Sequence, residues 1–451
     1  PTLPRWARVA TGVAAAGVIA WIGTAFPPVH EVLALHTWGA GTPTTTRVTA
    51  FATLRPWWIG YEPEAVRVKD DGGIEAVVRV PRAEVRSTGR PVLPSRGIGY
   101  ELVLGLLTAL RSLASTDLIY DFRLYLLFQR AALLLALALA PLALYYARPE
   151  FRNPGSIWIY NLANLPLLIV WPHGARYLTE GIVDSALAPA CAVASVGALV
   201  LILRGLRLET RTGTLGLVSA ALFLGFCTMI RAEFLAIDGF ALAILALPCL
   251  RERRRFAGLG LAAALLIAVP VAYGVANHAL FGRFVPLRLQ SGQNLVEPIG
   301  QFPNPYGIRY DDAWLDGYLR AHGHEYFGLD TDRFLTGVYV RLLRDDPRLF
   351  LTNLDRRLTL FSRWLRVPLN SWTLPLVLAL ALVLAWRDPR FLPVSLPLML
   401  VIGYLLLFGW TNSLFRLVAP AHFLLTVFGG YAAAYAAARL RARRPGYTVP
   451  P

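Results

Sequence analysis

Three arginines stand at the ends of apolar segments, where a guanidinium group could bind a phosphate. Arg176 lies in GARYLTEGIVD, Arg231 in MIRAEF and Arg416 in NSLFRLVAP. A planar guanidinium donates two parallel hydrogen bonds to one phosphate, so converging arginines could hold a phosphorylated ligand. The alternative is that each side chain extends along apolar surface to water, or pairs with an acidic neighbour, Glu180 or Glu233. Both interpretations stay open for each arginine, and we expect at least one of the three to contact phosphate.

Carboxylates that follow the first apolar segment could act as a general base. Glu31 comes directly after that segment, in PPVHEV, and Glu62 and Glu64 lie in GYEPEA. Each could equally be a solvated acid of a loop. The adjacent pair Asp70 and Asp71 precedes two glycines between stretches of alternating apolar residues, which predicts the tip of a β-hairpin. We therefore expect Glu31 or Glu62 to be the base, and the aspartate pair to form a turn.

The sequence does not favour a metal or nucleotide site. The stretch AHGHEY contains His322, His324 and Glu325, but no second ligand pair follows at a useful spacing. The three cysteines fall within apolar segments, which predicts neither a disulfide nor a zinc site. No glycine-rich phosphate loop is present in the sequence.

The composition indicates a chain that crosses a membrane several times. Apolar residues make up 56% of the chain and charged residues 16%, whereas about a quarter of a typical soluble protein is charged. The net charge of +16 comes almost entirely from arginine, because Lys69 is the only lysine. In a membrane protein this excess suggests topology and contact with anionic lipid. Because no basic stretch is interleaved with aromatic residues, we do not expect nucleic acid as a partner.

Ten apolar segments are long enough to cross a bilayer as helices. They are residues 6–26, 120–146, 155–172, 181–203, 213–230, 234–250, 257–281, 369–386, 391–409 and 417–438. The first is too long for the apolar part of a signal peptide, so we expect a retained helix. Arginines gather in alternate short connections, which predicts that these connections and both termini are cytoplasmic. The expected location is the inner, cytoplasmic membrane.

Two long connections, residues 27–119 and 282–368, then fall on the outer, periplasmic side. The first contains the expected small hairpin and an apolar stretch, 99–115, which we interpret as an interfacial or half-inserted helix. The second begins with a stretch rich in glycine, proline and asparagine, which predicts irregular structure.

Two amphipathic helices follow in the second connection. One is expected from about Thr331 to Arg344. The other begins at Pro347, with Asp346 as its N-cap. The sequence thus predicts an all-α polytopic membrane protein in three parts. These are an N-terminal transmembrane module (1–281), an outer loop (282–368), and C-terminal helices with a cytoplasmic tail (369–451).

Five motifs follow one another along residues 98–300 and the last span. They are GIGYELVLGLLTAL, RYLTEGIVDSALAPA, LGFCTMIRAEFLAI, NHALFGRFVPLRLQSGQNL and LFRLVAPAHFLL. In this order they resemble motifs of the integral-membrane glycosyltransferases of the GT-C class. The resemblance is to the bacterial branch related to protein O-mannosyltransferases and aminoarabinose transferases.

The resemblance implies a cell-envelope enzyme that transfers a sugar, with inversion, from a polyprenyl-phosphate donor to a lipid, glycan or protein acceptor. It implies a carboxylate base in the first outer loop and no required cofactor. The family's Asp-Glu-x-x-x-Tyr signature after the first span is missing here, and Glu31 is nearest to it in position. Two alternatives remain, a transporter or lipid flippase and a non-catalytic membrane partner with the same fold. The one-sided bulk and the lack of an inverted repeat argue against a transporter.

Overall fold

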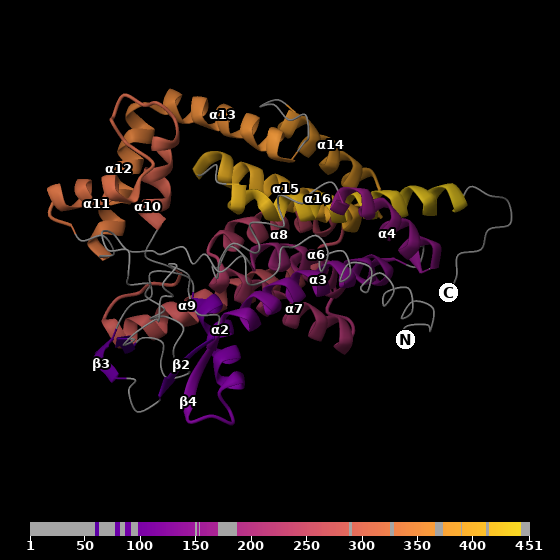
Figure 1. Ribbon diagram of the computed structural model, residues 1–451. Helices are drawn as coiled ribbons and strands as arrows, with labels where there is room; N and C mark the ends of the chain where they lie inside the picture. The colour runs from indigo at the N-terminus through magenta and orange to yellow at the C-terminus, as the bar shows by residue number, and fades with distance from the viewer. Residues whose placement is uncertain are drawn as a thin grey trace.

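The structure is a computed structural model in which long apolar helices form a bundle with a smaller group of helices at one end (Figure 1). It describes residues 59–62, 77–81, 86–91, 98–148, 151–152, 154–169, 187–287, 291–324, 329–365, 373–388, 390–411 and 415–442. The first predicted span, 6–26, therefore lies outside the described residues.

The other nine predicted spans each overlap an α-helix. These helices are α3 (Phe122–Ala147), α4 (Pro154–Ile169), α6 (Ala188–Gly205), α7 (Arg211–Ile230), α8 (Glu233–Arg251), α9 (Arg255–Phe281), α14 (Thr373–Arg387), α15 (Phe391–Thr411) and α16 (Phe415–Ala442). In the described part, seven are long and apolar enough to cross a membrane, and α14 is apolar but shorter. The chain is an α-helical membrane protein. The total of ten membrane spans remains a prediction from the sequence.

Several of the long helices begin or end at a recognisable capping residue. Asp121 accepts a hydrogen bond from the backbone N–H of Leu124 at 3.2 Å and so caps α3. Thr210 caps α7 through the N–H of Gly213 at 3.1 Å. Helix α9 ends at Gly282, whose φ of 67° suits a residue without a side chain. These caps satisfy backbone groups that have no partner within the helix.

Small residues let the helices of the bundle approach closely. A Cβ atom at Gly258 in α9 would lie 2.3 Å from the carbonyl oxygen of Leu206, after α6. A Cβ atom at Gly225 in α7 would lie 2.7 Å from the side chain of Val269 in α9. Within a bilayer, helix association depends on such close packing because lipid is as apolar as the helix faces.

The arginine-rich connections meet at one end of the bundle, which we call the arginine-rich end. Here Arg251, at the end of α8, donates to the backbone carbonyl of Trp386 in α14. Arg439, at the end of α16, lies 3.8 Å from Asp388, in the turn before α15. This gathering matches the alternation of arginines along the sequence. The membrane side that this end faces stays a prediction.

Among the described residues before α3, four short strands form two antiparallel pairs. Strand β1 (Ile59–Glu62) pairs with β3 (Arg86–Pro91), and β2 (Val77–Pro81) pairs with β4 (Asp117–Asp121). The predicted hairpin tip at Asp70 and Asp71 lies outside the described residues. The span predicted to start at residue 120 begins slightly later, because residues 117–121 pair with β2.

Helix α2 (Ile98–Arg111) occupies the stretch where an interfacial helix was predicted. It packs on the C-terminal turn of α7. A Cβ atom at Gly99 would lie 2.7 Å from the backbone of both Met229 and Ile230. Only glycine permits this approach, so Gly99 fixes α2 beside the end of α7.

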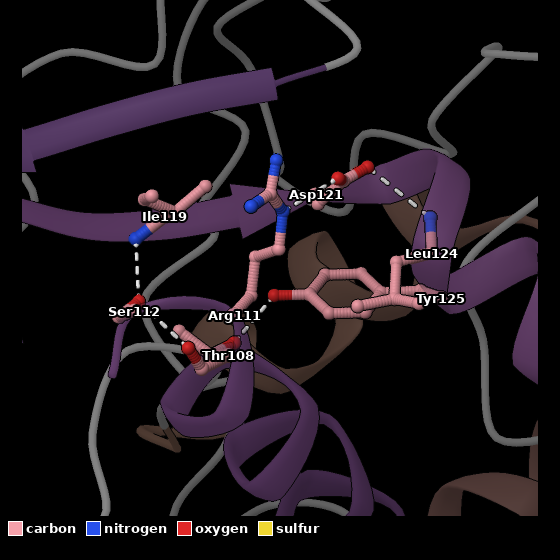
Figure 2. A network of polar contacts seen from close by, with 7 residues as sticks. All are labelled: Thr108, Arg111, Ser112, Ile119, Asp121, Leu124 and Tyr125. Atoms are coloured by element: carbon pink, nitrogen blue, oxygen red, sulfur yellow. Dashed lines mark hydrogen bonds and ion pairs between the residues drawn. The ribbon is translucent and has the colours of Figure 1, made fainter. Parts of the chain in front are cut away.

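A network of polar contacts joins α2 to β4 and α3 (Figure 2). The hydroxyl groups of Thr108 and Tyr125 lie 2.5 Å apart, and Arg111 forms an ion pair with Asp121 at 3.2 Å. Ser112 accepts a hydrogen bond from a backbone N–H of β4 at 2.8 Å. The connection before α3 is thereby held to the bundle.

Five elements between α9 and α14 form the group that we call the helical module. They are α10 (Ser291–Val296), the 3-10 helix η5 (Glu297–Gln301), α11 (Asp312–Ala321), α12 (Leu329–Asp345) and α13 (Pro347–Leu365). In Figure 1 the module, in orange, lies on the side away from the C-terminal end of α16. It has a hydrophobic core of its own, which includes Leu315, Leu335 and Phe350.

The two predicted amphipathic helices are confirmed as α12 and α13. Asp346 accepts a hydrogen bond from the N–H of Leu349 at 3.1 Å, as expected of an N-cap. The prediction of irregular structure after α9 is wrong for residues 291–301, which form α10 and η5. The N–H of Gly292 donates to Asp332 in α12 at 2.6 Å, a tertiary contact that the local composition does not reveal.

Candidate functional site

Two of the predicted site residues, Arg231 and Glu233, are described with their side chains. The backbones alone are described for Glu62, at the end of β1, and Arg416, at the start of α16. The remaining predicted residues lie outside the described part, and they are Glu31, Glu64, Arg176 and Glu180. Convergence of the three arginines therefore stays a prediction.

Arg231 and Glu233 form a buried ion pair at the break between α7 and α8. Arg231 is the C-cap of α7, and its extended backbone (φ −146°, ψ 123°) turns the chain toward α8. Its Nη2 atom lies 2.6 Å from Oε1 of Glu233, and the two side chains are only 6% and 12% exposed. Arg231 thus pairs with its acidic neighbour, which is one of the two interpretations that the sequence left open. Contact of Arg231 with phosphate stays a prediction.

A second polar group, around Asp238, is linked to this ion pair through Tyr404, and together they form what we call the buried polar cluster. Asp238 in α8 is fully buried, and Ser195 in α6 is the hydroxyl that interacts with it. Within the described part, neither Asp238 oxygen accepts a hydrogen bond of ordinary geometry. Tyr404 in α15 interacts electrostatically with Arg231, Glu233 and Asp238. Ionisable groups within a membrane bundle are costly, so this cluster is a candidate functional site.

The buried polar cluster lies toward the end of the bundle that carries the helical module. Helix α7 runs from the arginine-rich end to Arg231, and α8 returns from Glu233. Helix α2, held by Gly99, packs against the same end of α7.

Arg357 attaches the helical module to this end of the bundle. It is 3% exposed, and its guanidinium donates to the carbonyls of Trp410 at 2.8 Å, Gly409 at 3.3 Å and Pro298 at 2.6 Å. Burial lowers the pKa of Arg357 to about 10, and Tyr339 partly opposes this shift. The side chain therefore remains positively charged at neutral pH. One buried cation thus connects α13, η5 and the end of α15.

Glu297, beside this connection, is a carboxyl group that titrates near neutral pH. Burial and the nearby carboxyl of Asp312 raise the pKa of Glu297 to about 7, against the effect of a hydrogen bond from Gln293. The Gln293 Nε2 atom lies 3.3 Å from the carboxyl. Groups with a pKa near the working pH are suited to general acid–base catalysis. Glu297 is therefore an additional candidate for proton transfer.

Sequence reasoning missed three of these groups. Asp238 could have been found, because an acid inside an apolar span is itself a signal. Arg357 could also have been found, because it lies on the apolar stripe of α13 with Phe350, Leu354 and Phe361. Glu297 carried no such signal, because its raised pKa depends on burial within the folded module and on Asp312 from a separate helix.

The histidine pair of the module is engaged in aromatic contacts. The rings of His322 and His324 lie 5.3 Å and 4.4 Å from that of Phe334. His322 also contacts the carbonyl oxygen of Tyr318 at 2.7 Å. Among the described residues no group of three His, Cys, Asp or Glu side chains could hold a metal ion.

Comparisons with known proteins assign no family to this arrangement. No family model matches the chain, and neither a curated protein nor a solved structure does. The resemblance to the GT-C class rests on the five sequence motifs alone.

Proposed function

We propose that the protein is a membrane-embedded glycosyltransferase that uses a polyprenyl-phosphate sugar at the outer face of the membrane. The observation that carries this proposal is the buried guanidinium of Arg231, which lies between α7 and α8 at the end of the bundle that carries the helical module. A buried cation between two spans suits the phosphate of a lipid-linked donor, because the lipid chain can remain in the bilayer. The five motifs and the carboxyl group of Glu297, beside the module's attachment, support the same reaction.

In the proposed reaction the carbon–oxygen bond between sugar and phosphate breaks while the acceptor oxygen attacks the opposite face of the sugar. The polyprenyl phosphate leaves with an additional negative charge. A guanidinium held in place by Glu233 stabilises this charge more in the transition state than in the donor. Arg231 then contacts the donor directly, and Glu233 is a positioning residue. Arg176 and Arg416 are proposed as further phosphate ligands on the basis of their motifs.

The acceptor hydroxyl loses its proton to a carboxylate. Glu31 is our first proposal for this base and Glu62 the second, because both belong to the first outer loop. Glu297 is a third candidate, supported by its raised pKa and its place beside the module's attachment. Replacing the true base by glutamine should abolish transfer and leave donor binding intact, because binding needs no proton acceptor.

A transporter is the second candidate, and one observation favours it. Asp238 is a fully buried acid within a span, and acids in this position often line ion or proton pathways. A transporter would move a substrate across a vesicle membrane without breaking the bond between sugar and phosphate.

The test uses the purified chain in detergent and in sealed vesicles, with a panel of polyprenyl-phosphate sugars. The proposal expects release of polyprenyl phosphate in the presence of an acceptor. The variant Arg231→Lys should release it more slowly. Arg254→Lys is its matched control, because this exposed arginine lies at the arginine-rich end. Movement of intact donor across vesicles with no release of polyprenyl phosphate would favour the transporter.

A further inference from the structure

A basic cavity of about 320 Å³ lies at the arginine-rich end of the bundle. Elements α3, α6, α8, α9 and α15 all contribute to its walls. Four arginines line it, together with apolar side chains that include Leu203 and Leu392, and the arginines are Arg148, Arg204, Arg207 and Arg255. Cationic and apolar groups thus meet in one hollow where the spans end.

Two of these arginines are held in place by one acid, Glu252. The Nε atom of Arg207 lies 2.8 Å from Oε1 of Glu252 and its Nη2 atom 3.0 Å from Oε2. The Nε atom of Arg255 lies 2.8 Å from Oε2 of the same carboxylate. Glu252 balances one of the four positive charges, so the cavity is strongly cationic.

The other two arginines have no acidic partner within the described part of the chain. Arg148 is the C-cap of α3, and Arg204 lies in the last turn of α6. The guanidinium of Arg204 lies 5.8 Å from the centre of the Tyr146 ring, which helps to orient it. Two guanidinium groups without a carboxylate partner in a shared hollow favour an anionic ligand.

We propose that this cavity binds the phosphate of an anionic lipid headgroup. Headgroups lie at the level where the spans end, and basic pockets between transmembrane helices suit them. Arg148 and Arg204 would donate to the phosphate, while the start of the acyl chain contacts the apolar lining. A free phosphate ion shares the headgroup's chemistry but does not use the apolar side chains.

This site is separate from the one proposed for sugar transfer. Helices α7 and α8 join the two ends, with Arg231 and Glu233 at one end and Arg207 and Glu252 at the other. Lipid binding at the arginine-rich end can therefore fail or hold independently of any transferase activity.

The test measures thermal unfolding of the detergent-purified chain with added short-chain phosphatidylglycerol, short-chain phosphatidylcholine or inorganic phosphate. The variant is Arg148→Gln/Arg204→Gln, which preserves side-chain size approximately. The matched control is Arg253→Gln/Arg254→Gln, which removes the same charge from exposed arginines of the α8–α9 turn that do not line the cavity. We expect phosphatidylglycerol to stabilise the wild type and the control. Its apparent affinity for the variant should be weaker by at least about tenfold.

The three ligands separate the possible outcomes. Equal effects of phosphatidylglycerol on variant and control, or equal effects of the two lipids on the wild type, would overturn the proposal. Stabilisation by millimolar inorganic phosphate and none by phosphatidylglycerol would also overturn the proposal, because the ligand would then be free phosphate and not a lipid. Native mass spectrometry of the purified chains provides a second measurement if the variant is unstable on heating. Retention of anionic lipid should then be lost in the variant alone.

Discussion

Helix α8 has an arginine–glutamate ion pair at each end, and the two ends differ mainly in burial. At the module end, the Arg231 and Glu233 side chains are 6% and 12% exposed. At the arginine-rich end, the Arg207 and Glu252 side chains are 48% and 31% exposed. Water can screen the second pair but hardly reaches the first. The cost of removing these charged groups from water is therefore large only for the buried pair.

The largest expected effect is a loss of stability when one partner of the buried ion pair is removed and the other is kept. Arg231→Ala leaves the Glu233 carboxylate buried without its partner, and should destabilise the fold by about 3–5 kcal/mol. Arg231→Met/Glu233→Leu should recover most of this loss, because a well-packed apolar pair has no charge to desolvate. Denaturant unfolding in detergent measures both values. A double variant as unstable as Arg231→Ala would show that the buried charge is not the cause.

The next largest effect on stability is expected at Arg357, the other buried arginine at the end of the bundle that carries the helical module. Arg357→Leu removes the donor for three backbone carbonyls, and should cost about 2–4 kcal/mol in the free energy of unfolding. Arg356→Leu is the control, since Arg356 is the exposed neighbour on the same helix. Protease cleavage within the module should also increase for the first variant alone. Equal effects of the two substitutions would refute the role of Arg357 as the attachment.

A smaller effect should appear as a dependence of stability on pH. The pKa of Glu297 is raised from 4.5 to about 7 in the folded chain, so the folded state holds a proton that the unfolded state has lost. Stability from this group is therefore present below about pH 4.5 and declines as the pH rises through about 7. Glu297→Gln should remove that decline, which we expect to be on the order of 1–3 kcal/mol. Unfolding curves at pH 5 and pH 8 provide the measurement, and an unchanged pH dependence in the variant would contradict the assignment.

The smallest effect is expected at the exposed end of α8. Glu252→Gln removes the acid shared by Arg207 and Arg255. Because these side chains are solvated, the thermal midpoint should not change measurably without added ligand. A large loss of stability would mean that this end is as sensitive as the buried one.

Apolar segments and charge alternation were enough to predict nine described helices and the gathering of the arginine-rich turns. The N-cap at Asp346 was also predictable, because Asp followed by Pro is a local signal. Helix α10 and strand β4 were not predictable in this way. The first depends on a contact between Gly292 and Asp332, and the second on pairing with β2. Neither contact leaves a pattern in the local sequence.

The candidate site was predictable only in part. The sequence singled out Arg231 and Glu233 from their place at the end of a span, and it also raised the possibility that they pair. It could not show that Tyr404 lies near them, because α8 and α15 are far apart along the chain. The grouping of four arginines around one cavity likewise depends on how five elements pack.

The rate of sugar transfer by the wild-type chain and by Arg231→Lys is the most direct test of the central claim. Lysine retains the positive charge beside Glu233, so the variant should remain folded, but it lacks the planar fork that binds phosphate through two hydrogen bonds. We predict that the wild type releases polyprenyl phosphate from a lipid-linked sugar, and that Arg231→Lys does so at least about tenfold more slowly. A wild type that consumes no donor, or a folded Arg231→Lys that works at the wild-type rate, would contradict the account.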